Sequence, residues 1–399
     1  MADNNENKVL NVPHLRFPEF SGEWEEHTLS EYLEFKNGLN PDAKRIGSGL
    51  PFISVMDILS EGVINYDNIR GKVNATEKEI ECFGVKDGDL LFQRSSETLE
   101  DVGRANVYMD NRTAIYGGFV IRGRKIGNYD PLFFKYLLAT PLARKRTCRM
   151  GAGAQHFNIG QEGLSKISLY FPSIEEQRKI AEFLSLIDER IATQNKIIED
   201  LKKLKSAIIH RCYSSQTNMI PLSELLKQCS DRNRSGSDLQ VLSVSNKYGF
   251  IAQSNQFEDR EVASDDTSNY KVVKKGMFAY NPARINVGSI ALYEMDGNGI
   301  VSPMYVCFTT KSELLPSYLK YYFASQTFKH EMYKRLEGSV RLCLTFEELC
   351  NIEIHLPSIE QQKNISKYIS KIENNLSLVD SICSKYQQQR RYLLSQMFI

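Results

Sequence analysis

The sequence predicts an α+β protein: two mixed α/β domains are joined by two long helices that form an antiparallel coiled coil, with a pseudo-twofold internal repeat. Three observations predict this fold: a length of 399 residues, a segment repeated at a fixed offset, and a long apolar stripe that ends each copy. At about 150 residues per domain, the length allows two or three domains. Apolar residues make up 42% of the chain and charged residues 25%, as in an ordinary soluble protein that buries cores.

The internal repeat is the strongest of these observations. The segments Pro172–Ile187 and Pro357–Ile372 align without a gap, and half of their paired residues are identical. We call the difference between their residue numbers, 185, the repeat offset. The same offset pairs Pro131 with Pro316, whereas farther upstream the offset drifts to between 188 and 193. The chain is therefore two copies of one unit.

Each copy ends in a long predicted helix. Residues 173 to 214 contain no proline or glycine, and apolar residues recur in steps of three and four, as in a coiled coil. About 38 residues at 1.5 Å each give a rod of roughly 55 Å. Ser173 and Ser358 are the expected N-caps. The residues predicted along the seam are Ile180, Leu184, Ile187, Ile191, Leu201, Ile365, Ile369, Ile372, Leu376 and Val379.

Chain order determines how the two helices pair. The first helix delivers the chain to the second domain, and the second helix starts from that domain, so paired helices must run antiparallel. Polar residues interrupt the stripe at Gln194, Lys205 and Arg390, and such seam residues set register and direction. The predicted boundaries are 1–171 for the first domain, 172–215 for the first helix, 216–356 for the second domain and 357–399 for the second helix.

The two domains show mixed α/β patterns. Short β-rich runs bounded by Gly, Asn and Asp occur at 51–55, 89–92, 119–122, 241–245, 276–280 and 304–308. One helix is predicted from Pro131 to about Lys145, and its counterpart runs from Pro316 to about Arg335.

Charge and motif counts exclude several classes of protein. Fifty Lys and Arg against 49 Asp and Glu leave a net charge of +1, so any nucleic-acid face must be local. The eight cysteines form no C-x-x-C pair and the six histidines have no metal-ligand spacing, so no structural metal is expected. The first fifteen residues lack a signal peptide and no window approaches 18 apolar residues, which predicts a cytoplasmic protein without a membrane partner.

Local chemistry suggests two DNA-contacting faces in each domain. Four cations fall within residues 144–149, and a glycine-rich stretch follows at 151–158. A basic helix end can hold phosphates while Gln155 and Asn158 read base edges; a solvated helix end followed by a loop is the alternative. The second face follows a predicted strand, at 93–96 in the first copy and 281–284 in the second, where a turn with an exposed arginine is the alternative.

The chain resembles the specificity subunit of type I restriction-modification systems. The resemblance rests on two divergent domains each followed by a similar long helix, on the opening Leu15-Arg-Phe-Pro-Glu-Phe-Ser-Gly-Glu-Trp24, and on the twin Pro-Ser-Ile-Glu-x-Gln boxes. It implies that the domains are target recognition domains, each reading one half of a split sequence in double-stranded DNA. It also implies that the helices are spacers whose seam region docks two modification (methyltransferase) subunits, and that restriction (motor-nuclease) subunits complete the complex.

The residues predicted to contact DNA lie in the two faces and in weaker candidates near them. In the first copy they are Arg94, Ser95, Ser96, Arg104, Arg144, Lys145, Arg146, Arg149, Gly153, Gln155, His156 and Asn158. In the second copy they are Ser243, Ser245, Asn246, Lys247, Asn281, Arg284, Ser339 and Arg341.

The sequence predicts that the chain is not an enzyme by itself. It has no P-loop, the Gly151-Ala-Gly153 stretch has histidine in place of the third glycine, and Asn281-Pro282 lacks the rest of a methyltransferase box. We expect no cofactor on this chain, and S-adenosylmethionine, ATP and Mg²⁺ on partner subunits. A coiled-coil protein-interaction scaffold without DNA binding and a standalone methyltransferase are the alternative functions.

Overall fold

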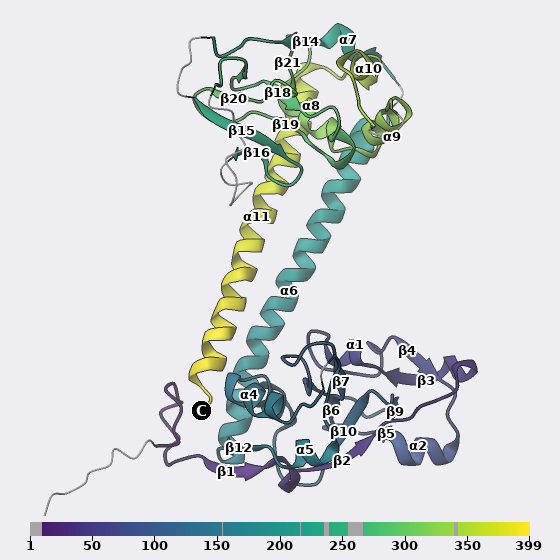
Figure 1. Cartoon of the computed structure of the whole chain (residues 1–399), viewed down its shortest axis with the longest axis vertical. Coiled ribbons are helices and arrows are strands. Elements are labelled where there is room, and N and C mark those ends of the chain that lie inside the picture. The colour runs from purple at the N-terminus through teal and green to yellow at the C-terminus, as the bar shows by residue number, and fades with distance from the viewer. Residues whose placement is uncertain (1–9, 154, 216, 235–238, 254–265, 339–341) are drawn as a thin grey trace, which may run out of the picture. The chain divides into compact units, whose positions relative to one another are not determined.

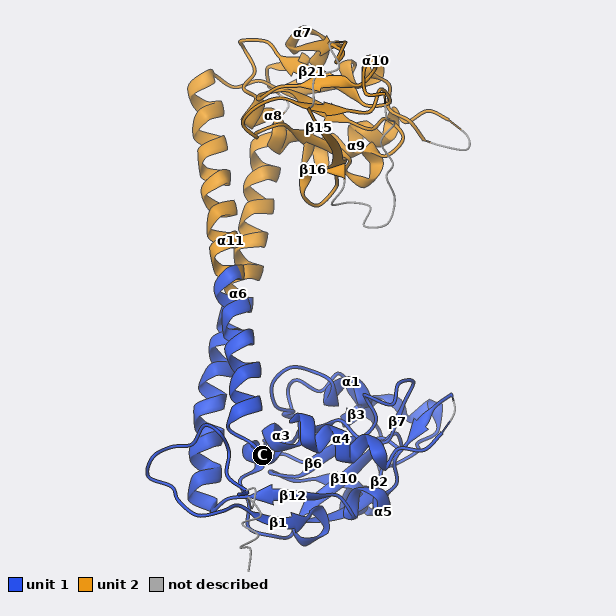
Figure 2. Cartoon of the chain, turned by 60° about the vertical axis from the view of Figure 1, so that its left-hand side comes forward, with its two compact units in different colours: residues 1–195, 381–399 blue, residues 196–380 orange. Residues whose placement is uncertain are grey.

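A computed structural model describes residues 10–153, 155–215, 217–234, 239–253, 266–338 and 342–399. The chain forms two compact units, residues 1–195 with 381–399, and residues 196–380 (Figure 2). Each unit contains a mixed α/β head and one stretch of each long helix, because the division between the units falls within the two helices. Among the described residues, no helix has the length and apolar character needed to cross a membrane.

The head of the first unit contains two four-stranded sheets (Figure 1). The first has the order β2 (Leu33–Asn37), β10 (Val120–Lys125), β6 (Leu90–Gln93), β8 (Ala105–Val107), and all its neighbours are antiparallel. The second has the order β4 (Gly71–Val73), β3 (Ile46–Ile53), β9 (Ala114–Tyr116), β5 (Gly84–Val85), with β3 and β9 parallel. Buried Ile53, Leu91 and Tyr116 share one apolar cluster, so the two sheets pack through their apolar faces.

Smaller elements complete this head. Two ribbons pair β1 (Glu25–Thr28) with β12 (Ser168–Phe171), and β7 (Ser95–Ser96) with β11 (Phe157–Asn158). The helices are α1 (Val55–Ile58), α2 (Glu77–Phe83), α3 (Pro131–Leu138), α4 (Pro141–Arg149) and α5 (Gln161–Ser165).

The head of the second unit repeats this plan. One sheet has the order β14 (Leu226–Cys229), β21 (Val306–Thr310), β18 (Phe278–Tyr280), β19 (Ile290–Leu292), and the other has the order β16 (Gly249–Ala252), β15 (Gln240–Ser245), β20 (Gly299–Val301), β17 (Lys271–Val273). A ribbon pairs β13 (Met219–Pro221) with β22 (Glu353–His355). The helices are α7 (Leu222–Leu225), α8 (Pro316–Phe323), α9 (Gln326–Lys334) and α10 (Phe346–Cys350).

The predicted α+β class is confirmed, and each predicted β-rich run overlaps a strand. The prediction of a single helix in each head is wrong, because each predicted range contains two helices. α3 ends at Leu138, and Thr140 caps α4 by accepting from the Ala143 amide, with Pro141 at the first position of α4. Ser325 likewise accepts from the Phe328 amide and starts α9. A side-chain cap inside each run starts a new helix axis.

The two long helices are α6 (Ile174–Tyr213) and α11 (Ile359–Gln396). Both predicted N-caps are confirmed: the Ser173 hydroxyl accepts from the Glu176 amide at 3.4 Å, and the Ser358 hydroxyl accepts from the Gln361 amide at 3.3 Å. Six seam residues are buried, namely Ile180, Leu184, Ile187, Ile191, Ile369 and Ile372. The other four, Leu201, Ile365, Leu376 and Val379, are half-buried.

The helices run antiparallel within each unit. In the first unit, Arg390 of α11 pairs with Asp188 of α6 at 2.5 Å, and the Cys383 thiol donates to the Asn195 amide oxygen at 3.3 Å. Residue numbers therefore rise along α6 as they fall along α11. In the second unit, Lys205 pairs with Glu373 at 2.5 Å, and Ile209 and Ile369 share a core.

The polar seam residues anchor each head to its helices. The Tyr136 hydroxyl of α3 donates to Asp188 at 2.9 Å, and the Tyr321 hydroxyl of α8 donates to Glu373 at 2.9 Å. The repeat offset relates Tyr136 to Tyr321, Asp188 to Glu373, and Lys205 to Arg390. Burial and the neighbouring carboxylate raise the pKa of both tyrosines, so the hydroxyls remain donors at neutral pH. Two copies of one tyrosine–carboxylate–cation cluster thus repeat the same anchor.

Reversing one seam charge is expected to destabilise the second unit. Lys205→Glu places a second carboxylate beside Glu373, and both side chains are only about one-third exposed, so we expect a loss of about 1–2 kcal/mol. Adding Glu373→Lys should restore most of the melting temperature in thermal denaturation. Lys203→Glu is the control, because Lys203 and its partner Glu199 are both more than 70% exposed. An equal loss in the control would contradict the seam role.

The segment before β1 binds both helices of the first unit. Arg16 donates two hydrogen bonds to the buried Glu176 of α6 at 2.8 and 2.7 Å, and the Leu15 amide donates to the Gln396 carbonyl of α11 at 2.8 Å. Trp24 is 2% exposed and packs edge-on against Phe133 and Phe398. The Leu15–Trp24 opening therefore holds α11 against the head of this unit.

Candidate nucleic-acid interface

Two predicted faces of the first unit meet in the structure. The segment 93–96, which we call the post-strand segment, follows β6, and its Ser95 and Ser96 pair with Asn158 and Phe157 through β7 and β11. The glycine-rich stretch is a hairpin closed by hydrogen bonds in both directions between Ala152 and Asn158, at 3.0 and 2.9 Å. We call the described residues 152–153 and 155–158 the recognition hairpin. Two segments that lie far apart in the sequence therefore form one surface.

Glycine is required inside this hairpin. Gly153 has φ = +141°, and a Cβ added there would lie 1.9 Å from the carbonyl oxygen of His156. A residue with a Cβ rarely adopts this φ, and its Cβ would not fit into the space available here. The flanking Gln155, His156 and Asn158 are exposed, so the hairpin presents amide and imidazole groups outward.

The second unit contains the same pair of elements. Glu337 and Cys343, the counterparts of Ala152 and Asn158 at the repeat offset, are paired by backbone hydrogen bonds of 3.0 and 2.8 Å. We call the described residues 337–338 and 342–343 the hairpin of the second unit. Gly338, the counterpart of Gly153, has φ = +110°. The hairpin joins the post-strand segment 281–284 through the Leu344 amide, which donates to the Pro282 carbonyl at 3.1 Å, as the Ile159 amide donates to the Arg94 carbonyl at 3.0 Å. Ser339 and Arg341 lie outside the described residues.

The four predicted cations of α4 have different surroundings. Arg144 donates to the carbonyls of Glu100 and Val102 at 2.8 and 2.6 Å, which supports the loop before β8. Arg146 pairs with Glu26 of β1 at 2.7 Å and bonds to Ser168 of β12. Lys145 and Arg149 are exposed. Two of the four cations thus hold the unit together, which corrects the expectation that the whole cluster faces phosphates.

The remaining first-unit candidates lie near the hairpin and the helices. Arg94 is half-buried and donates to the Gly118 carbonyl at 3.4 Å. Arg104 is 53% exposed and pairs with Asp101 at 2.7 Å. Gln93, which ends β6, is 5% exposed and its amide donates to the Ser95 carbonyl at 2.9 Å. The buried amide of Gln93 shapes the post-strand segment and does not lie on its surface.

In the second unit, the β15–β16 turn lies beside the post-strand segment. Asn246 and Lys247 are exposed in this turn, and the Ser245 hydroxyl accepts from the Lys247 amide at 3.2 Å. A Cβ added at Gly288 would lie 3.5 Å from the Asn246 Cβ, and the Arg284 carbonyl accepts from the Ser289 amide. Arg284 is exposed and Asn281 half-buried. Ser243 is only 8% exposed within β15, which corrects its predicted place on the surface.

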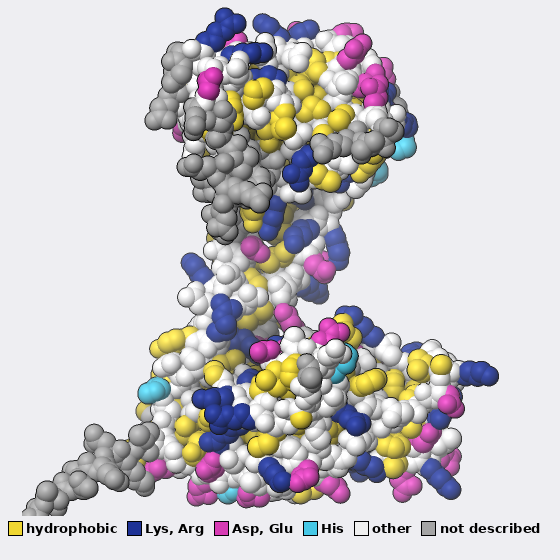
Figure 3. Space-filling view, viewed as in Figure 1, with side chains coloured by type: hydrophobic (Ala, Val, Ile, Leu, Met, Phe, Trp, Pro, Cys, Tyr) yellow, Lys and Arg dark blue, Asp and Glu magenta, His cyan; other side chains and the backbone are white. Residues whose placement is uncertain are grey.

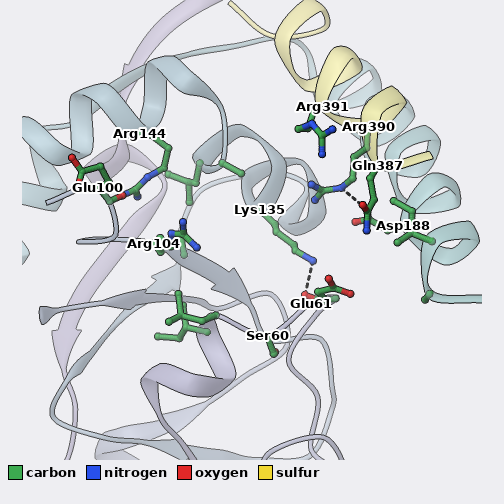
Figure 4. A pocket seen from close by; sticks show the side chains of 18 of the residues that line it. Ser60, Glu61, Glu100, Arg104, Lys135, Arg144, Asp188, Gln387, Arg390 and Arg391 are labelled. Atoms are coloured by element: carbon green, nitrogen blue, oxygen red, sulfur yellow. Dashed lines mark hydrogen bonds and ion pairs between the residues drawn. The ribbon is translucent and has the colours of Figure 1, made fainter. Parts of the chain in front are cut away.

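A basic cleft of about 870 Å³ lies in the first unit between the head and the helices. Figure 4 shows Arg104 and Arg144 on one side and Arg390 and Arg391 on the other. Lys135 projects between them and donates to the Gly62 carbonyl, and burial lowers its pKa to about 8. Six lining residues are cationic, against three carboxylates. This local excess of positive charge suits a phosphate backbone. On the face shown in Figure 3, by contrast, basic and acidic side chains are mixed over the surface of each unit.

Sequence reasoning missed two kinds of surface residue. Arg391 of the cleft comes from the far end of the chain, and Phe119 and Met304, 69% and 61% exposed, stand beside the post-strand segments. Phe119 and Met304 are related by the repeat offset, which was the signal that could have found them.

Within each unit, the buried seam residues predicted for partner docking pack inside the chain. By contrast, Leu186 and Tyr392 on the helices of the first unit are 54% and 60% exposed.

Comparison with known proteins shows which family the chain resembles. The type I restriction modification DNA specificity domain matches residues 21–203 and 236–382. The type I restriction enzyme MjaVIII specificity subunit of Methanocaldococcus jannaschii is 25% identical over 402 residues, covering 91% of this chain and 88% of that protein.

Solved structures share the fold. The S subunit of a type I restriction-modification system from M. genitalium has a TM-score of 0.62 at 16% identity, over 97% of this chain and 99% of that one. A chain from a study of complex assembly and conformational transition in the type I system has a TM-score of 0.54 at 14% identity, over 94% and 97%. With the family domain matched in both units, this chain belongs to the type I restriction-modification DNA specificity family.

Proposed function

We propose that this chain is the DNA specificity subunit of a type I restriction-modification complex, in which each head reads one half of a bipartite target. The observation that carries the proposal is the repeated interface: each unit joins a hairpin, which contains a glycine with positive φ, to a post-strand segment, and an equivalent backbone hydrogen bond makes this connection in both units. Exposed amides and cations there match what base edges and phosphates accept. Two such surfaces in one chain suit a split sequence.

The proposed division of labour leaves catalysis to partners. Two modification subunits dock on the helices and bring S-adenosylmethionine, restriction subunits bring ATP and Mg²⁺ chemistry, and this chain supplies sequence selection in the cytoplasm. The antiparallel helices set the gap between the half-sites.

Methylation mapping tests this function. The chain is produced together with its modification (methyltransferase) subunit, and methylated bases are mapped across the host genome. A split motif is the expected result. Replacing residues 16–171 with another recognition domain should change one half only. A random methylation pattern, or a change in both halves, would reject the proposal, and binding of S-adenosylmethionine by the isolated chain would favour a standalone methyltransferase.

The cleft predicts a specific effect on salt dependence. Lys145 is exposed and lines the cleft, so Lys145→Gln should remove one phosphate contact. The plot of log affinity against log salt should become shallower by about one unit, for specific and unrelated duplexes alike. Lys166→Gln is the control because Lys166 is paired with Glu162 on the surface. Equal slopes for the wild type and Lys145→Gln would show that Lys145 in the cleft does not contact the DNA backbone.

Shortening both helices should shorten the gap between half-sites. Asn195 and Cys383 lie opposite each other, so deleting 192–198 from α6 and 380–386 from α11 removes matched heptads. Seven residues span about 10 Å, or roughly three base pairs at 3.4 Å each. Methylation mapping of the deletion variant should return the same half-sites with a shorter gap. An unchanged gap would show that the helices do not measure it.

A further inference from the structure

A large apolar side chain stands on the same turn in both units. Phe119 is 69% exposed and Met304 is 61% exposed, and the repeat offset relates them. Each is the third residue of a turn that one backbone hydrogen bond closes. The Val120 amide donates to the Gly117 carbonyl at 2.9 Å, and the Tyr305 amide donates to the Ser302 carbonyl at 3.0 Å. We call residues 117–120 and 302–305 the apolar turns.

Packing beneath each apolar turn fixes its backbone. Gly117 and Gly118 are buried, and a Cβ added at Gly118 would lie 1.8 Å from the side-chain oxygen of Asn40. In the second unit, Lys271 donates to the Tyr305 carbonyl at 2.6 Å. The exposed side chain therefore projects from a backbone that its own unit holds in place.

The apolar turn borders the candidate interface in each unit. The Arg94 amide donates to the Phe119 carbonyl at 2.9 Å, while the Arg94 carbonyl accepts from Ile159 just after the recognition hairpin. In the second unit the Asn281 amide group contacts the Met304 sulfur at 3.6 Å, next to Pro282, which the hairpin joins. Apolar turn, post-strand segment and hairpin therefore adjoin in this order in both units.

The chemistry of DNA suggests a partner for these side chains. Single exposed apolar residues are common on protein surfaces, but here two diverged units keep a large one at the same turn of the same interface. Phenylalanine cannot hydrogen-bond a base edge, and the methionine sulfur is at best a weak acceptor. The apolar group that base pairs display in the major groove is the C5-methyl of thymine.

We propose that Phe119 and Met304 each contact a thymine methyl group in the half-site of their unit, and so select a thymine at one position. This inference rests on the proposed DNA recognition by the two heads. It adds one specificity-determining residue to each head.

Uracil substitution tests the inference with the complex of chain and methyltransferase. The probe is a duplex carrying the split motif mapped for the wild type, with the thymines of either strand replaced one at a time by deoxyuridine. At one position of one half-site, deoxyuridine should weaken wild-type binding about five- to tenfold. Phe119→Ala should weaken binding to the thymine duplex by a similar factor. Deoxyuridine at that position should then cause no further loss of affinity.

Matched variants separate this contact from general effects. Ile126→Ala removes a side chain that is 60% exposed in the same head and should keep the full response to deoxyuridine. Met304→Ala should lose the response in the opposite half-site, whereas Met295→Ala, at a side chain 38% exposed, should keep it.

Three results would overturn the inference. The first is a Phe119→Ala variant that binds the thymine duplex as tightly as the wild type does. The second is a Phe119→Ala variant whose affinity falls by the same factor on the thymine duplex and on every deoxyuridine duplex, and the third is a mapped half-site without thymine in either strand. Failure of the wild-type complex to prefer the split motif over an unrelated duplex would instead reject the proposed function itself.

Discussion

Gly153→Ala is expected to weaken specific DNA binding on the order of a hundredfold. The added Cβ would meet the His156 carbonyl at 1.9 Å on a backbone with φ = +141°, so the hairpin must change shape and displace the exposed Gln155 and Asn158. Two lost base contacts at roughly 1–3 kcal/mol each account for the effect. Fluorescence anisotropy with the split-motif duplex measures it in the complex with methyltransferase.

The control is the same substitution at the next glycine along the chain. A Cβ added at Gly160 meets no described atom within 4 Å, so Gly160→Ala should bind as wild type does. Methylation mapping of Gly153→Ala should show one relaxed half-site, and Gly338→Ala should relax the other, because its φ is +110°. Wild-type affinity for Gly153→Ala would show that the recognition hairpin does not read DNA.

Phe398→Ala is expected to destabilise the first unit by about 3–5 kcal/mol, as truncations of buried phenylalanines do. Phe398 is 5% exposed, and its ring lies 5.4 Å from Phe133 and 6.1 Å from Trp24 between centroids. Its loss leaves a cavity where α11 meets the head. Trp24 is the single tryptophan of the chain, so its fluorescence reports unfolding at this site. The urea midpoint should fall by more than about 1 M.

Tyr392→Ala is the matched control, because Tyr392 lies near the end of α11, shortly before Phe398, and is 60% exposed. It should leave the urea midpoint of the Trp24 fluorescence transition unchanged. Tyr213, the counterpart of Phe398 at the repeat offset, packs against Tyr318 in the second unit. Tyr213→Ala should therefore destabilise the second unit and leave the Trp24 signal largely unchanged. A Trp24 transition that is insensitive to Phe398→Ala would contradict the packing described.

Much of the fold could be predicted because its signals are local or periodic. The apolar stripes, the serine caps at Ser173 and Ser358 and the repeat offset are all visible along the chain, and the structure confirms the helices that they predict. The helix break at Thr140 was missed although its signal is also local: a capping threonine directly before a proline.

Much less of the candidate interface could be predicted. Arg144 and Arg146 have the charge of phosphate ligands, but their partners lie 22 to 120 positions away, and no spacing rule reports such distant neighbours. Ser243 carries a polar side chain in an apolar strand, and only the packing of β15 shows that it is buried. Residue type indicated the chemistry, whereas burial decided which groups remain on the surface.

The sequence by itself determined the duplication, the α+β class, the two long helices and their antiparallel sense, because periodicity and chain order depend only on neighbours along the chain. The tertiary structure alone decided that hairpin and post-strand segment form one surface, that Tyr136 and Tyr321 anchor the heads on carboxylates of α6 and α11, and that Phe119 and Met304 stand exposed beside the interface. These features depend on contacts between distant residues, which packing and hydrogen bonding establish only in the folded chain.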